Sequence, residues 1–553
     1  MKPVTTGTED FREFLTGNFY YIDKTDFIET VFHEKVSLFT RPRRFGKTLN
    51  MSMLYYFFSN KEQESARLFD GMKISKNTEI MRHQNQYPVI FLTLKDMKNP
   101  DFKQQTDYFS FLIAREVRNH EELFDSPHLL SSEKETLKRY DFRQADLIDL
   151  QNALLNLCTC LEKHYQKKVI LLIDEYDVPL QSAFLNGYYN EMSHFISAVF
   201  SSALKTNPSL ERGVLTGCLR IAKESIFTGL NNFSVYSIFN KDASSRHFGF
   251  TDGEVDRILA DYHLTEYKDR TAEWYDGYLF GNEEIYNPWS VLNYVKQIVY
   301  GNDPQPRSYW ANTSSNDIVY NYIKTGTYEM KQTFEALVQG HAVTEHIAEE
   351  LTYREMDDTE NVYSFMLFTG YLKIKEAVCG ADGEPLPGVY RLVIPNKEVQ
   401  IIFENQFQKY FTDYVRDKKG LFLDDLKEGR VDHANLLLND ILFNSVSFYD
   451  NYEAFYHGFM TGLFAGYPVE SNMESGEGRF DIAVLSPNPF GTNVVIECKK
   501  SKERKDLKED SRKAARQITE KKYVEGLQAR GYDIVRGYGI AFYGKGCYIT
   551  AAE

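Results

Sequence analysis

One short segment constrains the fold more than any other: an apolar strand, a loop ending in Gly46-Lys47-Thr48, and a helix follow one another. The apolar run Val36–Phe39 predicts the strand. In this arrangement backbone N–H groups and the helix N-terminus cradle phosphates. A lysine then reaches the β- and γ-phosphates, and a threonine hydroxyl binds Mg²⁺. The segment therefore predicts a parallel α/β sheet that binds a nucleoside triphosphate through Lys47 and Thr48.

The loop before this lysine departs from the usual glycine-rich pattern. Arg41 stands where GxxxxGK[ST] has its first glycine, and a β-carbon there could tighten the loop. Arg43 and Arg44 add positive charge, so we expect them to contact the nucleotide together with Gly46. GKT alone is a weak signal, and the strand and helix on either side make it more specific.

A second strand ends in two acids. The buried-type run Val169–Ile173 is followed directly by Asp174 and Glu175. The carboxyl ends of parallel strands open at the ligand crevice. We expect Asp174 to hold Mg²⁺ through its hydration shell and Glu175 to orient or deprotonate the attacking water. A buried strand that merely stops at a charged turn would look the same in isolation, and the upstream GKT favours the nucleotide site.

A third strand, Gly213–Thr216, also ends in a polar residue, and Arg220 follows it closely. Thr216 or Arg220 could sense the γ-phosphate from this end of the sheet. A structural salt bridge explains Arg220 equally well, so both interpretations stay open here.

Near the end of the chain, a predicted strand pair carries two acids and a lysine. Asp481 opens one strand, and Glu497 and Lys499 end the other. Because side chains alternate along a strand, Glu497 and Lys499 share a face, where Asp481 can meet them across the pair. Two carboxylates with the Cys498 carbonyl suit Mg²⁺ or, alternatively, Mn²⁺. A lysine beside them can act on the water that attacks a phosphodiester, so the pattern predicts a metal-dependent phosphodiesterase.

Two neighbours bear on this second site. Glu453, on a predicted helix, is a further candidate metal ligand, although an exposed helix charge is an equal alternative. His457 fits a packed or hydrogen-bonded helix residue better than a ligand.

The segment after the second site is basic within an acidic protein. Residues 499–522 hold eleven Lys and Arg against five Asp and Glu, while the whole chain has a net charge of −15. Four of the cations recur at helical spacing and could contact phosphates: Lys505, Lys508, Arg512 and Arg516. A solvated helix face is the usual explanation of such a run, and the position after Lys499 favours nucleic acid.

Length and composition set the outer limits. A chain of 553 residues is too long for one core, and its net charge excludes a general polyanion binder. The six cysteines form no CxxC pair, and the sequence contains neither an apolar leader nor a membrane-length apolar run. We therefore expect a cytoplasmic protein without membrane contact. The expected domains are a nucleotide-binding domain over 1–250, a helical middle region and linker over 251–430, and a metal-dependent domain over 431–553.

In these motifs the chain resembles a bacterial family that joins an AAA-ATPase-like domain to a PD-(D/E)XK nuclease superfamily domain. The resemblance covers nearly the whole length. It rests on these strings: Gly7-Thr-Glu-Asp-Phe, Tyr21-Ile-Asp-Lys-Thr, Thr40-Arg-Pro-Arg-Arg-Phe-Gly-Lys-Thr-Leu-Asn-Met, Leu172-Ile-Asp-Glu-Tyr-Asp, Tyr275-Asp-Gly-Tyr, Tyr286-Asn-Pro-Trp-Ser, Phe455-Tyr-His-Gly-Phe, Glu474-Ser-Gly-Glu-Gly-Arg-Phe-Asp and Ile496-Glu-Cys-Lys.

The resemblance implies an ASCE-type P-loop domain, a helical middle region and a C-terminal α/β restriction-endonuclease-like domain. It implies that Asp481, Glu497 and Lys499 form the nuclease triad, with Gln517 as an accessory residue. It also implies that Arg41 belongs to this family's version of the loop. Phe480 stands where the superfamily's name has proline, which leaves the acid in place.

We interpret the chain as an ATP-binding and ATP-hydrolysing module coupled to a Mg²⁺-dependent DNA nuclease. Homo-oligomerisation stays open. The alternative is an ATP-operated switch or scaffold whose last domain binds nucleic acid or protein without cleaving it.

Overall fold

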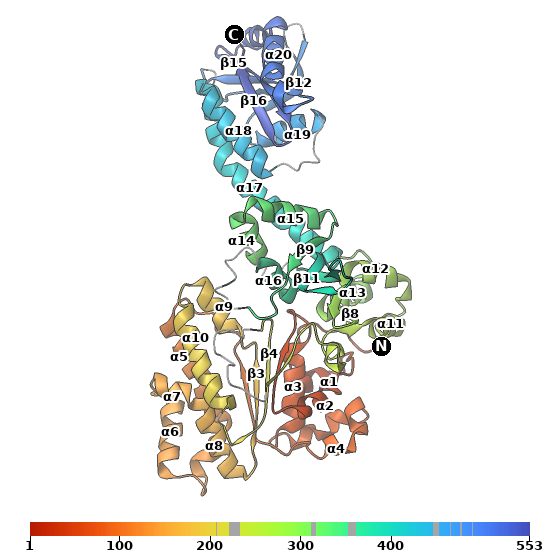
Figure 1. Cartoon of the computed structure of the whole chain (residues 1–553), viewed down its shortest axis with the longest axis vertical. Helices are drawn as coiled ribbons and strands as arrows, with labels where there is room; N and C mark the ends of the chain where they lie inside the picture. The colour runs from red at the N-terminus through yellow and green to blue at the C-terminus, as the bar shows by residue number, and fades with distance from the viewer. Residues whose placement is uncertain are drawn as a thin grey trace. The chain divides into compact units, whose positions relative to one another are not determined.

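The computed structural model describes residues 1–205, 207–220, 233–310, 317–351, 355, 361–445, 453–464, 466–475, 478–488 and 490–552. The chain forms two compact units, Met1–Ile318 with Thr325–Phe403, and Val319–Lys324 with Glu404–Glu553. Figure 1 shows the elements of each unit. Within the described residues, no helix combines the length and the apolar character that crossing a bilayer requires.

The first unit is built on a five-stranded parallel sheet in the order β2-β3-β4-β1-β5. All residues of β1 and β3 are buried, as expected for strands covered on both faces. Because β4 lies between β1 and β3, the ends of the loop strand and the acidic strand both flank the end of β4. This sheet confirms the predicted parallel α/β class. The strands are β1 Val36–Thr40, β2 Val89–Thr93, β3 Val169–Asp174, β4 Leu210–Gly217 and β5 Phe233–Tyr236.

Helices flank this sheet on two sides. Figure 1 shows α1 to α4 on one side of it and α5 to α10 on the other. The helix α3 starts directly after the phosphate loop and packs on β2 and β3. The helices are α1 Phe11–Thr16, α2 Phe27–His33, α3 Lys47–Phe58, α4 Thr78–Met81, α5 Phe102–Asn119, α6 Ser131–Asp141, α7 Leu147–Gln151, α8 Ala153–Tyr165, α9 Val178–Leu185 and α10 Tyr189–Phe200.

The middle of the chain is largely helical, as predicted, and also contains two small sheets of three strands each. Its helix α13 begins at Pro288, and the Asn287 side chain caps it by accepting the N–H groups of Trp289 and Ser290. The elements are β6 Phe250–Thr251, α11 Asp252–Asp261, α12 Lys268–Tyr275, β7 Tyr278–Phe280, β8 Glu283–Tyr286, α13 Pro288–Gly301, α14 Asp317–Thr325, α15 Tyr328–Val338, β9 Val343–His346, α16 Val362–Thr369, β10 Lys373–Cys379 and β11 Pro385–Val393.

The second unit is built on a mixed sheet in the order β12-β13-β14-β15-β16, in which only the β14–β15 pair is parallel among the described strands. One face packs against α17, α18 and α19, and the other against α20 and α21. The elements are α17 Lys397–Glu428, α18 Val431–Ser445, α19 Glu453–Leu463, β12 Val469–Ser475, β13 Gly478–Val484, β14 Asn493–Lys500, α20 Leu507–Glu520, α21 Tyr523–Ala529, β15 Val535–Tyr543 and β16 Gly546–Ala551.

Gly539 allows α20 to pack closely on this sheet. A β-carbon at Gly539 of β15 would lie only 2.2 Å from the Ala515 nitrogen and 2.3 Å from the Ser511 carbonyl oxygen. Only glycine therefore permits this close approach of helix and strand. The contact holds α20 beside β14, the strand that carries Glu497 and Lys499.

Candidate nucleotide and metal sites

The phosphate loop connects β1 to α3 through two left-handed residues. Gly46 (φ 83°) is the N-cap of α3, and Arg44 (φ 68°) adopts a conformation that non-glycine residues rarely take. Lys47 follows at the first turn of the helix and is almost fully buried. Its ammonium nitrogen lies 3.3 Å from the Arg41 carbonyl oxygen and 3.2 Å from that of Pro42. The loop backbone thus folds around the lysine.

Asp174 sits at the centre of this region, with two threonines bound to it. Thr48 donates to one carboxylate oxygen at 2.8 Å, and Thr216 donates to the other at 2.5 Å. Burial, with repulsion from Glu175, raises the pKa of Asp174 to about 6, although both hydroxyls favour the charged form. The strand ends of β3 and β4 and the start of α3 therefore bring together both predicted magnesium contacts, Thr48 and Asp174.

Glu175 turns back toward the lysine. Its backbone is left-handed (φ 55°), and its carboxylate lies 3.3 Å from the Lys47 ammonium. The Lys47 nitrogen also lies 3.6 Å from the Cys218 sulfur. Burial alone would lower the pKa of Lys47, but Cys218, Glu175 and Asp177 outweigh it and raise that pKa above its ordinary value. Lys47 is therefore held as a cation between acidic neighbours.

Arg41 does not face the phosphate region. Its side chain is fully buried and donates to the carbonyl oxygens of Tyr236 (2.7 Å) and Ser244 (3.0 Å). The guanidinium also lies over the Phe280 ring, 5.2 Å from its centroid. Burial lowers its pKa to about 9. Arg41, which stands where the motif has its first glycine, thus anchors the loop on the side away from the phosphate region.

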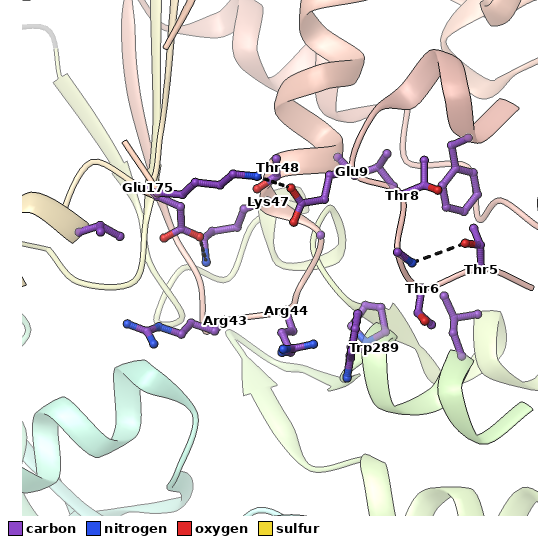
Figure 2. A pocket seen from close by; sticks show the side chains of 18 of the residues that line it. Thr5, Thr6, Thr8, Glu9, Arg43, Arg44, Lys47, Thr48, Glu175 and Trp289 are labelled. Atoms are coloured by element: carbon purple, nitrogen blue, oxygen red, sulfur yellow. Dashed lines mark hydrogen bonds and ion pairs between the residues drawn. The ribbon is translucent and has the colours of Figure 1, made fainter. Parts of the chain in front are cut away.

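A pocket of about 570 Å³ opens over the loop. Six of the predicted nucleotide-site residues line it: Arg43, Arg44, Gly46, Lys47, Thr48 and Glu175. Figure 2 shows Lys47, Thr48 and Glu175 close together in it. Arg43 donates to Gln181 at 2.7 Å, and Arg44 stacks on Trp289.

At the end of β4, the two sensor candidates differ. Thr216 contacts Asp174, whereas Arg220 forms an ion pair with Glu350 at 2.7 Å. The geometry therefore favours Thr216 for a role at the nucleotide site and a structural salt bridge for Arg220.

The second site lies where β13 and β14 separate. Their pairing runs from Val484↔Val494 to Ile482↔Ile496 and stops one position before Asp481 and Glu497. Asp481 lies within β13 rather than at its start. Its carboxylate accepts the Cys498 N–H at 2.7 Å, and the Gln517 amide of α20 donates to Glu497. A backbone N–H and a glutamine amide thus help to orient the two acids.

Comparison with known proteins finds family matches for two regions of the chain. Residues 5–227 match the family described as "Predicted AAA-ATPase", and residues 451–552 match the "PD-(D/E)XK nuclease superfamily". The chain therefore contains an AAA-ATPase-like domain and a PD-(D/E)XK nuclease superfamily domain. A curated relative from Azotobacter chroococcum mcd 1, named "Uncharacterized protein in vnfD 5'region", is 24% identical over 558 residues. The aligned region covers 96% of this chain and 95% of the relative, so the similarity spans both domains.

In the nuclease-superfamily domain, Lys499 lies half-exposed on β14, and its charge contributes to lowering the pKa of Asp510 on α20. The helix α19 begins at Glu453, but the side chain of this candidate ligand lies outside the described residues. Among the side chains that are described, no group of three or more His, Cys, Asp or Glu is placed to hold a metal. Asp481 and Glu497 form a two-carboxylate set, whose hard oxygens fit Mg²⁺ or Mn²⁺.

His457 and the basic helix complete this domain. The His457 Nε2 atom lies 3.1 Å from the Asp481 carbonyl oxygen and 3.2 Å from the Ser471 hydroxyl, so it supports the strand that carries the acid. Lys505 precedes α20 and pairs with Glu503. Four cations on α20 are exposed: Lys508, Arg512, Lys513 and Arg516.

Sequence reasoning missed one wall of the nucleotide pocket in the AAA-ATPase-like domain. Residues 5–9 and the start of α13 line this wall, including Trp289 and Leu292. Two of the strings that carried the resemblance, Gly7-Thr-Glu-Asp-Phe and Tyr286-Asn-Pro-Trp-Ser, contain part of this wall, namely residues 7–9 and Trp289. Their specificity was a usable signal, but nothing in either string indicates that the two meet in space.

Proposed function

We propose that this protein binds and hydrolyses ATP in its AAA-ATPase-like domain and cleaves DNA in its nuclease-superfamily domain with Mg²⁺. The observation that carries the proposal is a convergence of four residues. Lys47 and Thr48, at the start of α3 after β1, meet Asp174 and Glu175 at the end of β3, with β4 between the two strands. In this arrangement the four residues supply a cation that binds phosphate, a hydroxyl and a carboxylate for Mg²⁺, and a general base that can accept a proton from water.

The roles follow from the contacts. Lys47 exchanges its carbonyl and carboxylate neighbours for the β- and γ-phosphates of ATP. Thr48 and Asp174, joined by a hydrogen bond, are the residues that would hold Mg²⁺. Glu175, next to Asp174 and more exposed, takes the proton of the attacking water. Arg43 and Arg44 add positive charge at the pocket wall.

For cleavage, Asp481 and Glu497 are the residues that would hold Mg²⁺ or Mn²⁺. The bound cation would supply charge stabilisation for the phosphodiester and a more acidic water. Gln517 fixes the Glu497 carboxylate, and Lys499, on the same face of β14, positions the water and offsets developing negative charge. Glu453 remains a candidate third ligand.

Nucleic acid would bind along α20. Lys508, Arg512 and Arg516 are exposed on this helix, which packs directly on β14. Their charges suit phosphate contacts in a protein that is acidic overall. We assign the nucleotide domain to 1–250, the middle region to 251–430 and the nuclease domain to 431–553. The six free cysteines suit a reducing, cytoplasmic setting.

A direct assay tests the proposal. The purified chain is incubated with plasmid DNA, single-stranded DNA and RNA, each with and without Mg²⁺ and ATP. We expect Mg²⁺-dependent cleavage of DNA that changes when ATP is present, together with release of inorganic phosphate. ATP turnover with DNA binding and no cleavage product would instead establish the alternative, an ATP-operated switch that binds without cutting. Absence of ATP binding would reject the nucleotide site itself.

A further inference from the structure

The nucleotide pocket is larger than a triphosphate needs. Figure 2 shows Lys47, Thr48 and Glu175 on one side of it, and Thr5, Thr6 and Thr8 on the other, with Trp289 on the same side as the threonines. Its volume of about 570 Å³ lies in the range of small-molecule sites. The proposed phosphate contacts therefore account for one end of the pocket only.

The far wall is a preformed structure. The Val4 N–H donates to the Tyr300 hydroxyl at 3.2 Å, and the Thr6 hydroxyl donates to Asn293 at 3.3 Å. Both acceptors lie on α13, the helix that carries Trp289 in its first turn. The N-terminal segment and α13 thus form one wall, and the Asn287 cap holds the backbone N–H of Trp289 at the start of that helix.

On this wall Arg44 is stacked against Trp289. The guanidinium carbon lies 3.8 Å from the centre of the indole. Arg44 has a left-handed backbone (φ 68°), which is unusual for a residue other than glycine. Arg44 therefore presents a flat cation on a flat aromatic ring beside the phosphate loop, and nucleobases stack on both kinds of surface.

We propose that Trp289 and Arg44, together with residues 5–9, form the subsite for the base of the bound nucleoside triphosphate. This inference rests on the proposed binding of ATP. The base stacks on the Arg44–Trp289 pair, while the hydroxyls of Thr5 and Thr8 line its edge. Because every base has an aromatic face, the pair makes binding depend on the presence of a base. The triphosphate contacts of Lys47 and Thr48 are separate from it.

The test compares ATP with inorganic tripolyphosphate, both as Mg²⁺ complexes, by calorimetry on the full chain. Trp289→Ala should weaken ATP binding about tenfold, as expected for loss of one stacked base, and leave tripolyphosphate affinity unchanged. Trp289→Phe should retain most ATP affinity. Trp274→Ala, which removes another partly buried tryptophan outside the pocket, is the control.

The outcomes separate the two proposals. An equal loss for ATP and tripolyphosphate in Trp289→Ala, or no loss for either, overturns the base subsite and leaves the phosphate site standing. If wild-type protein binds neither compound, the nucleotide assignment fails and the subsite with it.

Fluorescence gives a second readout that needs only a conservative change. The chain has three tryptophans, and Trp310 is fully buried. ATP should alter the tryptophan emission of wild type and of Trp274→Phe, and this change should disappear in Trp289→Phe. A full ATP-induced change that persists in Trp289→Phe would contradict the proposal.

Discussion

The nucleotide site and the carboxylate site differ in the hydrogen bonds and ion pairs that hold their acids. In the AAA-ATPase-like domain the cation Lys47 is buried against Glu175, and two hydroxyls hold Asp174. In the nuclease-superfamily domain, Asp481 and Glu497 receive hydrogen bonds from an amide N–H and a glutamine. The first site therefore already pairs its own positive and negative groups. In the second site, two hydrogen bonds from neutral donors help to orient the acids, and the two carboxylates suit a bound cation.

This difference predicts what each site is sensitive to. A site that pairs its own charges is disrupted when one member is removed, because its buried partners lose their compensation. In a site that binds a metal ion, removal of a carboxylate should instead lower the affinity for the metal. The following variants test this contrast in order of expected effect.

The largest effect is expected for Lys47→Ala, which should abolish measurable ATP binding. Arg43 and Arg44 contact other groups at the pocket wall, so we expect neither to replace the ammonium. Calorimetry with ATP·Mg²⁺ measures the loss, and Lys163→Ala, which removes a lysine paired with Glu133 elsewhere in the domain, is the control. Cleavage without ATP should persist. Unchanged ATP affinity in a folded variant would disprove the phosphate-site assignment.

Glu175→Gln should retain ATP and reduce its hydrolysis by about 10²–10⁴-fold, because the amide keeps the shape of the side chain but cannot accept a proton. Phosphate release under single-turnover conditions measures the step. Glu211→Gln is the matched control, because Glu211 lies near the start of β4, at the other end of this strand from the site. This variant should hydrolyse ATP at the normal rate. Wild-type turnover in Glu175→Gln would make Glu175 a structural acid that only pairs with Lys47.

Lys499→Ala tests the carboxylate site. Since Lys499 acts on the water and the developing charge, the variant should still bind Mn²⁺ while cleavage falls about 10²–10³-fold. Asp481→Ala and Glu497→Ala should weaken metal binding as well as cleavage. Lys500→Ala, on the opposite face of β14, is the control. Metal affinity measured by calorimetry would separate the roles. Loss of metal binding in Lys499→Ala would show that the lysine holds the site together.

The sequence predicted much of the first site because its groups sit at strand ends. Strand runs such as Val169–Ile173, followed by acids, indicate both the fold and the place where Asp174 and Glu175 must lie. The role of Arg41 could not be predicted, since its burial depends on the carbonyls of Tyr236 and Ser244, which are distant in sequence. The Trp289 wall was missed for the same reason. Local patterns reveal strand ends, whereas contacts between distant loops require the folded chain.

The smallest effect concerns Asp177, which tests the charge pairing of the first site from within. One carboxylate oxygen accepts the N–H groups of Cys218 (2.9 Å) and Leu219 (3.1 Å). The other is buried and has no hydrogen-bond partner in the part of the chain that the structure describes. Burial, with repulsion from Glu175, raises the pKa of Asp177 from 3.8 to about 6. Folding therefore favours the protonated acid.

The sign of the pH dependence follows from this shift. A carboxyl group whose pKa is raised by folding contributes stability that is present below pH 4 and lost as the pH rises through 6. Asp177→Asn keeps an oxygen for both N–H groups and carries no charge. We expect it to be more stable than wild type at pH 7.5, by on the order of 1–2 kcal/mol, with a smaller advantage at pH 5. Thermal unfolding at both pH values measures the difference, with the exposed Asp70→Asn as control. A variant less stable than wild type at pH 7.5 would mean that Lys47 needs the Asp177 charge, and that the site's acids and cation are balanced more tightly than their pKa values indicate.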